Sequence, residues 1–257
     1  MPAINPSVLN DKVELIFAET LKADAFARQI HELLSFYADR TKRTTATAAA
    51  LETAHMMHVP SPVLRNLCTM IHKRGRREGD EWIPAAQQLW RSGLQEMRLV
   101  AICMLSEAPS ERMLGVASTW AAESEEQNVL RSLASEGIGP WRQSNPDQTL
   151  ASAGGWIEAE STQVFGLIVL QKSIQDESIS DLPAVFDMLS GLPAVARGLE
   201  LDALRDLLLT LAQRSPAETT AFMLEEIASG EIRAQRLARA IAEALPAAFR
   251  SQLRQTL

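Results

Sequence analysis

The fold is decided between Val59 and Leu105, where the chain reads VPSPVLR (59–65), then the basic segment HKRGRR (72–77), then AAQQLWRSGLQEMRLVAICML (85–105). Apolar residues in these pieces recur with the spacing of a helix face, and prolines and glycines separate the pieces. Each piece is therefore predicted to be helical, with short connections between the helices.

Helix boundaries of the same kind recur along the whole chain, about every 15 to 20 residues, as in folds of short antiparallel helices. Serine caps helix N-termini, and proline fits the first turn, where its missing N–H costs nothing. The predicted helix starts lie at Ser61-Pro62, Pro84, Pro109 to Arg112 and Ser215-Pro216, and the predicted turns at Gly137 to Pro140 and at Gly154-Gly155.

The composition of the 257 residues favours an all-α fold. Ala and Leu dominate and lose little rotamer freedom in a helix, whereas Val and Ile never alternate with polar residues over a strand length. Helix pairs recurring at roughly 35 to 40 residues predict a curved α-solenoid of HEAT-like antiparallel helix pairs, because each pair buries its apolar face only against its neighbours. No long linker divides the chain, so residues 1–257 are expected to form a single domain. A compact helical bundle is the competing architecture.

The sequence has no run of about 18 apolar residues, so no membrane span is predicted. The N-terminal MPAINPSVLNDKVEL lacks the pattern of a targeting leader, and we expect a cytoplasmic protein. Cys68 and Cys103 each lie in an apolar helical stretch and are predicted to be small buried side chains, not a disulfide or a metal pair. No glycine-rich phosphate loop or Cys/His metal spacing is present, so no cofactor is expected.

The net charge of −7 is distributed unevenly. Residues 28–98 hold 11 Lys and Arg against 7 Asp and Glu, residues 99–200 hold 5 against 14, and residues 201–257 hold 7 against 7. A surface that binds phosphates is basic where it meets them. Only the first third of the chain, and one face of the C-terminal helix, meets that condition.

The chain resembles the bacterial DNA alkylation-repair glycosylases, which are built from HEAT-like helical repeats, in the order VPSPVLR, Leu89-Trp90, Glu96-x-Arg98 and LVAICML. The likeness covers about residues 58–230. It implies an all-helical protein that binds damaged DNA and cleaves the bond between base and sugar. The later segments that carry the likeness are STWAAESEEQNVLRSL (118–133), GIGPW (137–141), GGWIEAESTQVFGLIVL (154–170) and SPAETTAFMLEE (215–226).

The resemblance implies an active-site cleft with aromatic walls, a carboxylate near the sugar of the damaged nucleotide and an arginine on its backbone. The carboxylate stabilises the cationic sugar that forms as the glycosidic bond breaks. If Trp120 is the first Trp of the family's segment, its Trp-Asp-x-x-Asp core falls on Gln127 to Arg131. If Trp120 is the second, the Asp positions fall on Ala121 and Ser124. Either alignment removes both carboxylates.

The arginine pair and the late aromatic wall of the family are missing as well. No Arg occurs between Arg142 and Arg197, and no Trp follows Trp156. N-glycosylase activity is therefore predicted to be weak or lost, although enzyme activity of another kind stays open. Three glutamates are candidates for a rebuilt catalytic site: Glu123, Glu125 and Glu126.

Basic and aromatic side chains are the predicted nucleic-acid contacts. HKRGRR would contact phosphates, with a solvated turn that caps a helix C-terminus as the alternative. Trp120 and Trp156 are predicted cleft walls, because polar residues follow each at a helix end, whereas Trp90, among leucines, is predicted to be core. The predicted nucleic-acid-binding residues are Arg43, Lys73, Arg74, Arg76, Arg77, Arg98, Trp120 and Trp156.

Three other charged groups are interpreted structurally. Glu96 and Arg98 do not face each other on one helix and are expected to pair with neighbouring helices. Glu52-x-x-His55 with His58 has the spacing of half a metal site but is interpreted as solvated, because no second such motif exists. A C-terminal basic stripe is expected to be neutralised within the protein: Arg233, Arg236, Arg239, Arg250 and Arg254.

Two classes of function follow from these observations. The first is a divergent relative of the alkylation-repair glycosylases that binds double-stranded or damaged DNA through residues 40–77 and Arg98. The second is a non-catalytic protein-interaction scaffold, in which an acidic concave face of residues 99–200 binds a basic protein partner. DNA affinity that falls steeply with salt would distinguish the first class from the second.

Overall fold

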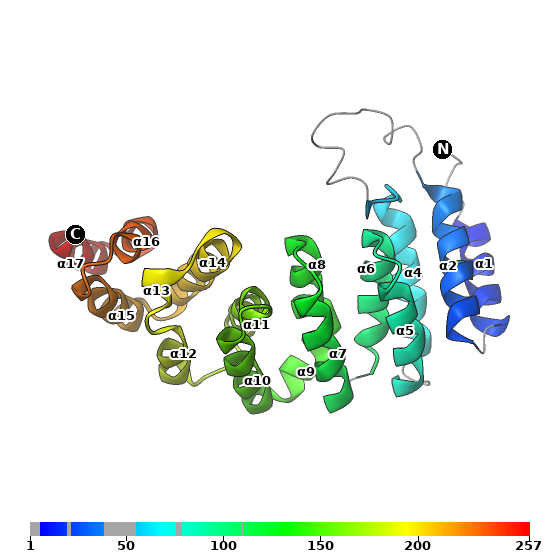
Figure 1. The fold of residues 1–257 in the computed structure, drawn as a ribbon, viewed down its shortest axis with the longest axis horizontal. Coiled ribbons are helices and arrows are strands. Elements are labelled where there is room, and N and C mark those ends of the chain that lie inside the picture. The colour runs from blue at the N-terminus through cyan, green and yellow to red at the C-terminus, as the bar shows by residue number, and fades with distance from the viewer. Residues whose placement is uncertain (1–5, 20–21, 39–54, 76–78, 109) are drawn as a thin grey trace. The chain divides into compact units, whose positions relative to one another are not determined.

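The computed structural model describes residues 6–19, 22–38, 55–75, 79–108 and 110–257, and within them every regular element is a helix (Figure 1). The all-α prediction is confirmed for these residues. The chain groups into two compact units: unit 1 comprises residues 1–120 and 136–140, and unit 2 comprises residues 121–135 and 141–257. None of the described helices is both long and apolar enough to cross a membrane.

Unit 1 is built from helices that pack on elements one and two places away in the chain. α1 packs on α2 and α4, α2 packs on α5, and α6 packs on both α4 and α5. Its elements are α1 (Pro6–Glu19), α2 (Ala23–Tyr37), α4 (Ser61–Gly75), the 3-10 helix η3 (Gly79–Trp82), α5 (Ile83–Trp90), α6 (Gln95–Leu105) and α7 (Glu111–Ala122).

In unit 2, too, helices pack on neighbours that are close in the chain. α11 packs on α8, α10 and α14, and α16 packs on α13, α14, α15 and α17. The elements after α7 are α8 (Gln127–Ser132), the π-helical η4 (Leu133–Gly137), α9 (Gly139–Ser144), α10 (Pro146–Glu158), α11 (Gln163–Gln175), α12 (Leu182–Leu189), α13 (Leu192–Val195), α14 (Gly198–Arg214), α15 (Pro216–Ala228), α16 (Ile232–Ala242) and α17 (Ala247–Thr256).

The predicted helix starts are confirmed. α4 begins at Ser61, α7 at Glu111 and α15 at Pro216, and Pro84 lies in the first turn of α5. Proline in the first turn leaves no N–H group unsatisfied there, whereas the Ser215 side chain accepts no capping hydrogen bond and Ser61 is the first residue inside α4. Local chemistry therefore decides where these helices begin.

The core of unit 1 follows the helical spacing of apolar residues. Val63, Leu67 and Ile71, four residues apart on α4, are fully buried and form one apolar face. α6 is buried over most of its surface, because α4 and α5 both pack on it. The apolar run LVAICML therefore forms the middle of unit 1.

The two predicted turns are largely helical. Gly154 and Gly155 lie inside α10, and Gly139 and Pro140 begin α9, so only Ile138 bends the chain after η4. A helix can contain glycine where its packing or its length stabilises it. The presence of glycine in the sequence does not reveal whether the helix continues.

Helices α10 and α11 approach each other closely at Gly166. A Cβ on this residue would lie 2.8 Å from Ile157 Cγ1, 3.0 Å from Ile157 N and 3.1 Å from Ala153 O. Two of these are backbone atoms, which cannot swing aside as a long side chain does. The hydrogen side chain of Gly166 is therefore required for the packing of α11 on α10.

Two side-chain links in unit 1 join residues 35 positions apart in the chain. Cys68 on α4 is bonded to Cys103 on α6, and His72 Nδ1 lies 2.5 Å from Glu107 Oε1, each pair being 35 residues apart in the chain. The step of four residues from Cys68 to His72 on α4 matches the step of four from Cys103 on α6 to Glu107, just after its end. The two helices therefore run side by side in the same direction.

The same separation recurs in unit 2. Gln171 Nε2 donates to the Asp206 carbonyl at 3.4 Å, and the Gly191 N–H donates to Glu226 Oε1 at 2.9 Å, again across 35 residues. The links in both units agree with the repeat of roughly 35 to 40 residues predicted from helix spacing.

Helix α15 begins with a side-chain hydrogen bond between its cap and its first turn. The Ser215 hydroxyl donates to the Glu218 carboxylate. This bond, together with one from the Glu218 backbone, lowers the pKa of the Glu218 carboxyl below its usual value. Because the folded-state pKa is depressed, the ionised cap contributes stability above the unfolded pKa and loses it as pH falls through the folded pKa.

Gly166→Ala is expected to destabilise the protein by about 1–3 kcal/mol, because the new Cβ meets backbone atoms of α10. Gly155→Ala is the control, since a Cβ there meets nothing within 4 Å. That change is expected to stabilise α10 by about 0.5–1 kcal/mol. Urea unfolding measures the free energy of unfolding of both variants. Equal changes in the two variants would contradict the role assigned to Gly166.

Ser215→Ala is expected to raise the pKa of Glu218 toward its usual value, because the hydrogen bond that lowers it most is removed. NMR titration of the Glu218 carboxyl in the two proteins measures the change. Ser251→Ala, whose hydroxyl donates to the Ala247 carbonyl, is the matched control. An unchanged pKa in Ser215→Ala would show that the hydroxyl does not stabilise the carboxylate.

Candidate nucleic-acid interface

A buried carboxylate holds the segment that leads into α4. Glu96, 4% exposed at the start of α6, accepts hydrogen bonds from the Met57 N–H (2.9 Å to Oε2) and from the Val59 N–H (3.2 Å to Oε1). Two backbone amides that converge on one anion form a nest. Glu96 thus reaches a neighbouring segment, as expected, but its partners are backbone amides and not the cation of an ion pair.

His58 lies between these two amides and has a left-handed backbone, with φ of 57°. A non-glycine residue adopts this conformation at a cost of about 1–2 kcal/mol. The imidazole is half-buried, and among the described residues its Nε2 is buried with no hydrogen-bond partner. Strained residues with unsatisfied polar atoms concentrate at functional sites, so His58 is a candidate functional residue, although its sequence pattern was interpreted as solvated.

The metal-site alternative involved His58 with two other residues. His55 is exposed, and Glu52 lies outside the described residues. Within the described ranges, no group of three or more potential metal ligands comes together.

The residues of the basic segment at the end of α4 differ in exposure and in contacts. Lys73 is exposed, whereas Arg74 is half-buried, with Nη2 3.1 Å from Glu14 Oε2 and Cζ 5.4 Å from the centroid of the Phe17 ring. Arg74 therefore binds α1, and Lys73 stays available to solvent. Three further predicted contacts lie outside the residues whose side chains are described: Arg43, Arg76 and Arg77.

An exposed stripe of α4 extends this basic end. Arg65, Thr69 and Lys73 are spaced by four residues and all are exposed, and His72 is exposed beside them. We call these four residues the α4 stripe. Arg65 and Lys73 stand about 12 Å apart along the helix. Arg65 was not among the predicted contacts, although it shares a helix face with Lys73 through Thr69 at a spacing of four residues.

Arg98 lies on a pair of stacked tryptophans. Its Cζ is 4.7 Å from the centroid of Trp90, and the Trp90 and Trp120 rings are parallel, with centroids 4.4 Å apart and planes within 2°. Trp90 is core, as predicted. The prediction that Trp120 lines a cleft is wrong: its side chain is 3% exposed, because Trp90 covers one face of it.

Trp156 is also an interior residue. Its side chain is 7% exposed and packs against Phe165 with ring centroids 4.9 Å apart, and the Thr162 hydroxyl donates to its carbonyl at 2.9 Å. The prediction of a cleft wall is wrong here too. The polar residues that follow Trp156 belong to the connection between α10 and α11, while the indole itself packs between helices.

The prediction that Cys68 and Cys103 do not form a disulfide is wrong. Their Cα atoms lie 5.7 Å apart across α4 and α6, and the sulfurs are bonded. Cys103 is buried, as predicted, and Cys68 is half-buried. The pairing depends on two helices lying side by side, which neither cysteine's local sequence reveals.

Two arginines of unit 2 form ion pairs within that unit. Arg131, which one alignment places at a family carboxylate, donates to Asp206 Oδ2 at 2.9 Å. Arg142, 2% exposed, lies 2.8 Å from Asp176 Oδ2. Of the glutamates considered for a rebuilt site, two are exposed and the last is half-buried: Glu123, Glu125 and Glu126.

Four of the five arginines of the C-terminal basic stripe bond to groups within unit 2, and the predicted neutralisation by carboxylates is seen for two of them. Arg250 Nη2 donates to the Glu243 and Leu245 carbonyls, both at 3.1 Å. Arg233, Arg239 and Arg254 donate to carbonyl or carboxylate groups as well. Arg250 and Arg254 pair with the Glu243 carboxylate, whereas Arg233 and Arg239 bond to backbone carbonyls, which do not neutralise their charge. Arg236 is exposed on α16.

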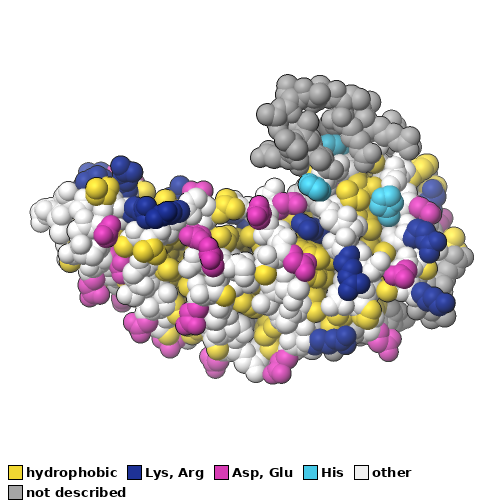
Figure 2. Space-filling view, viewed as in Figure 1, with side chains coloured by type: hydrophobic (Ala, Val, Ile, Leu, Met, Phe, Trp, Pro, Cys, Tyr) yellow, Lys and Arg dark blue, Asp and Glu magenta, His cyan; other side chains and the backbone are white. Residues whose placement is uncertain are grey.

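The two units differ in charge. Unit 1 has 14 Lys and Arg with 14 Asp and Glu, whereas unit 2 has 11 with 18, a balance of −7. Figure 2 shows acidic side chains along the edge of unit 2 below α10, α12 and α15. The net negative charge of the protein therefore comes from unit 2, and unit 1 is the less repulsive surface for phosphates.

A family model described as DNA alkylation repair enzyme matches residues 30–244. The match covers most of the chain, which is therefore an all-helical protein of a DNA-repair class. The chain belongs to the DNA alkylation repair enzyme family. The same comparisons found no match among curated proteins and none among solved structures.

Glu96→Ala is expected to destabilise the protein by roughly 2–4 kcal/mol, because two amide donors lose their acceptor beside a strained residue. Glu111→Ala, at the exposed start of α7, is expected to change stability by no more than about 0.5 kcal/mol. Chemical denaturation compares the two variants. A loss in Glu96→Ala no larger than in the control would refute the anchoring role of the carboxylate.

Proposed function

We propose that this protein binds double-stranded DNA, including alkylated DNA, through unit 1, and that its N-glycosylase activity is weak or lost. Membership of the DNA alkylation repair enzyme family over residues 30–244 is the observation that carries the proposal. The phosphate contacts in this proposal are the exposed cations of the α4 stripe, Arg65 and Lys73, together with the predicted contacts Arg43, Arg76 and Arg77.

Exposure and charge support the α4 stripe as the contact surface. Arg65 and Lys73 project from one face of a helix whose opposite face is fixed in the core. Cations on a rigid element bind phosphates without the entropy cost of ordering a loop, and each contact releases condensed counterions. Arg98, half-buried on Trp90, is a further cation close to this helix pair, since α4 packs on α6.

The loss of base excision is supported by the residues that a cleft would need. Trp120 and Trp156 are covered by other aromatic rings, so neither offers a free face for stacking on a base. The chain has no arginine between Arg142 and Arg197 and no tryptophan after Trp156. A positive charge, Arg131, stands in one alignment where a carboxylate would stabilise the cationic sugar.

The proposal includes a stack of HEAT-like helix pairs as the scaffold. Links across 35 residues in both units, and packing of helices two places apart such as α4 with α6, support this arrangement. In such a stack each pair contacts only its neighbours, so one helix position recurs at every step. The α4 stripe would then lie at a position that recurs along the stack.

A protein-interaction scaffold is the second candidate function. The balance of −7 on unit 2 favours it, because an acidic surface attracts a basic partner and repels phosphates. In this alternative the protein would bind no DNA and would co-purify with a basic protein.

Charge reversal on the α4 stripe tests the DNA proposal. The double variant Arg65→Glu/Lys73→Glu is expected to lower affinity for a short fluorescent duplex and to reduce the slope of log affinity against log salt by about 2, one for each lost phosphate contact. Fluorescence anisotropy at several salt concentrations measures both quantities. Arg236 is an exposed cation on α16 of unit 2, so Arg236→Glu is the matched control. This variant is expected to retain the affinity and the salt slope of the unmodified protein.

An equal loss in Arg236→Glu would place DNA binding on unit 2 and contradict the assignment to α4. Absence of binding by the unmodified protein at low salt would favour the scaffold. Release of methylated base from an alkylated duplex, measured on the same protein, is expected to be at or near background. Rapid release would show that a glycosylase site exists in spite of the missing family residues.

A further inference from the structure

Helices α1 and α2 expose large apolar side chains. Both helices pack inward, α1 on α4 and α2 on α5 and α6, and in Figure 1 they lie at one end of unit 1. Yet Leu15 is 57% exposed, Phe36 53% and Val8 45%. The described residues contain only six large apolar side chains with comparable exposure, and half of them lie on these two adjacent helices.

These three side chains share one face of the helix pair. A groove of about 290 Å³ runs between α1 and α2, and Leu15 and Phe36 line it from the two helices, together with the buried side chains of Ile16 and Leu33. Val8 precedes Leu15 by seven residues, or two helical turns, and so lies on the same face of α1. Single exposed apolar residues are ordinary on a protein surface, whereas a contiguous apolar patch marks a binding surface.

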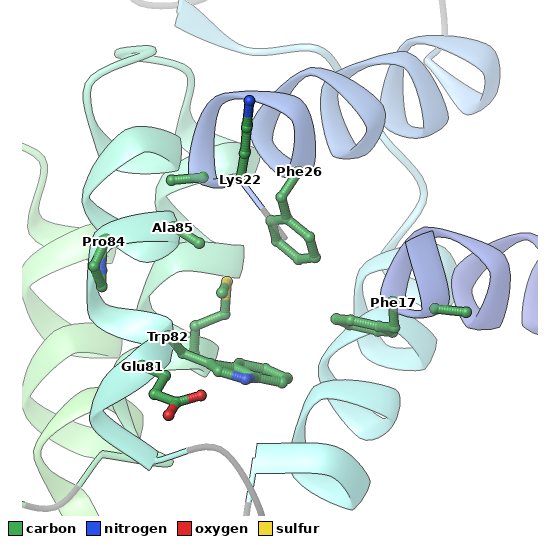
Figure 3. Close-up of a pocket in the computed structure, with 10 residues that line it drawn as sticks. Phe17, Lys22, Phe26, Glu81, Trp82, Pro84 and Ala85 are labelled. Atoms are coloured by element: carbon green, nitrogen blue, oxygen red, sulfur yellow. The ribbon is translucent and has the colours of Figure 1, made fainter. Parts of the chain in front are cut away.

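Aromatic contacts at the end of α1 and the start of α2 hold the two helices together. The ring centroid of Phe17 lies 5.5 Å from that of Phe26 and 5.6 Å from that of Trp82, and the three rings border one pocket of about 440 Å³ (Figure 3). Phe26 and Trp82 are each 5% exposed, so these rings pack on one another. The groove between α1 and α2 therefore lies on a fixed pair of helices, and a partner that binds there does not have to order it.

Two opposite charges flank this groove. Lys12 on α1 and Glu32 on α2 both line it, and both are exposed. Within the described ranges neither forms an ion pair, and Lys12 Nζ lies 4.2 Å from the centroid of Phe36, which still keeps half of its surface exposed. An apolar surface flanked by one charge of each sign is complementary to itself, because a two-fold axis brings Lys12 of each copy to the partner's Glu32.

The size of this face agrees with a weak, reversible contact. α1 has 14 residues and α2 has 15. At a rise of about 1.5 Å per residue and a spacing of about 10 Å between helices, their outer face measures roughly 20 by 20 Å. Burying such a face on each of two copies gives an area near the lower limit for specific interfaces, about 1,200 Å² in total.

We propose that the outer face of α1 and α2 binds the same face of a second copy of this protein, in a two-fold symmetric homodimer. The apolar side chains of Val8, Leu15 and Phe36 lose their contact with water at the centre of the interface. Lys12 and Glu32 pair across the two-fold axis at its rim and fix the register of the two copies. The proposal does not depend on DNA binding.

The mass of the full-length protein in solution tests the dimer directly. Sedimentation velocity at increasing concentration is expected to show reversible exchange between the 28.2 kDa monomer and a dimer. The expected dissociation constant is on the order of 1–100 μM. A monomer at every concentration would overturn the proposal. Assemblies that grow beyond the dimer would overturn it too, because a two-fold contact closes after two copies.

Two variants test the apolar centre of the interface. Leu15→Glu and Phe36→Glu are each expected to weaken dimerisation about tenfold or more, because each would bury an unpaired charge between the copies. Val195→Glu is the matched control, since Val195 is 60% exposed on α13 of unit 2, and it is expected to dimerise like the unmodified protein. Circular dichroism checks that each variant keeps its helical fold. Equal weakening in Val195→Glu would show that the contact does not lie on α1 and α2.

A charge exchange tests the two-fold symmetry. Lys12→Glu and Glu32→Lys are each expected to weaken self-association several-fold, because like charges then meet at both rim contacts. An equimolar mixture of the two variants is expected to form a heterodimer with about the affinity of the unmodified protein, since both contacts then join opposite charges. Arg112→Glu, at an exposed cation on α7, is the matched control and is expected to leave dimerisation unchanged. A mixture that does not associate would show that Lys12 and Glu32 do not meet across an axis, and the proposal would be wrong.

Discussion

The hydrogen bonds from the Met57 and Val59 amides to the Glu96 carboxylate are the constraint on which the rest of unit 1 depends. They fix the segment that enters α4 against the start of α6, so the two helices lie side by side from their first residues. The disulfide and the contact between His72 and Glu107 then join the same helices further along. A charge buried at 4% exposure is held by two donors, and the strain at His58 persists because this anchor compensates it.

This fixed pair of helices explains how unit 1 can present cations in a set geometry. The buried face of α4 cannot rotate, so Arg65 and Lys73 keep their places on the exposed face. The aromatic residues are used differently. Trp90, Trp120 and Trp156 stack or pack inside the protein, and two arginines, Arg74 and Arg98, rest on aromatic rings. The tryptophans that were expected to face a damaged base, Trp120 and Trp156, are therefore buried in the protein interior.

Prediction from the sequence succeeded where the signal is local. Helix starts at Ser61, Pro84 and Pro216 follow from the geometry of proline in the first turn, and the core position of Trp90 follows from its apolar neighbours. It failed where a neighbour distant in sequence decides. The local sequence at Gly154 predicts a turn, but helix α10 continues through this residue.

The sequence by itself determined the all-helical class, the positions where helices begin and the family, because each depends on residue spacings within a few helical turns or on the order of motifs. The tertiary structure alone decided which groups meet: Glu96 with two backbone amides, Cys68 with Cys103, and Phe17 with Phe26 and Trp82 around one pocket. These contacts join residues many positions apart, and only the packing of helix on helix brings them within bonding distance.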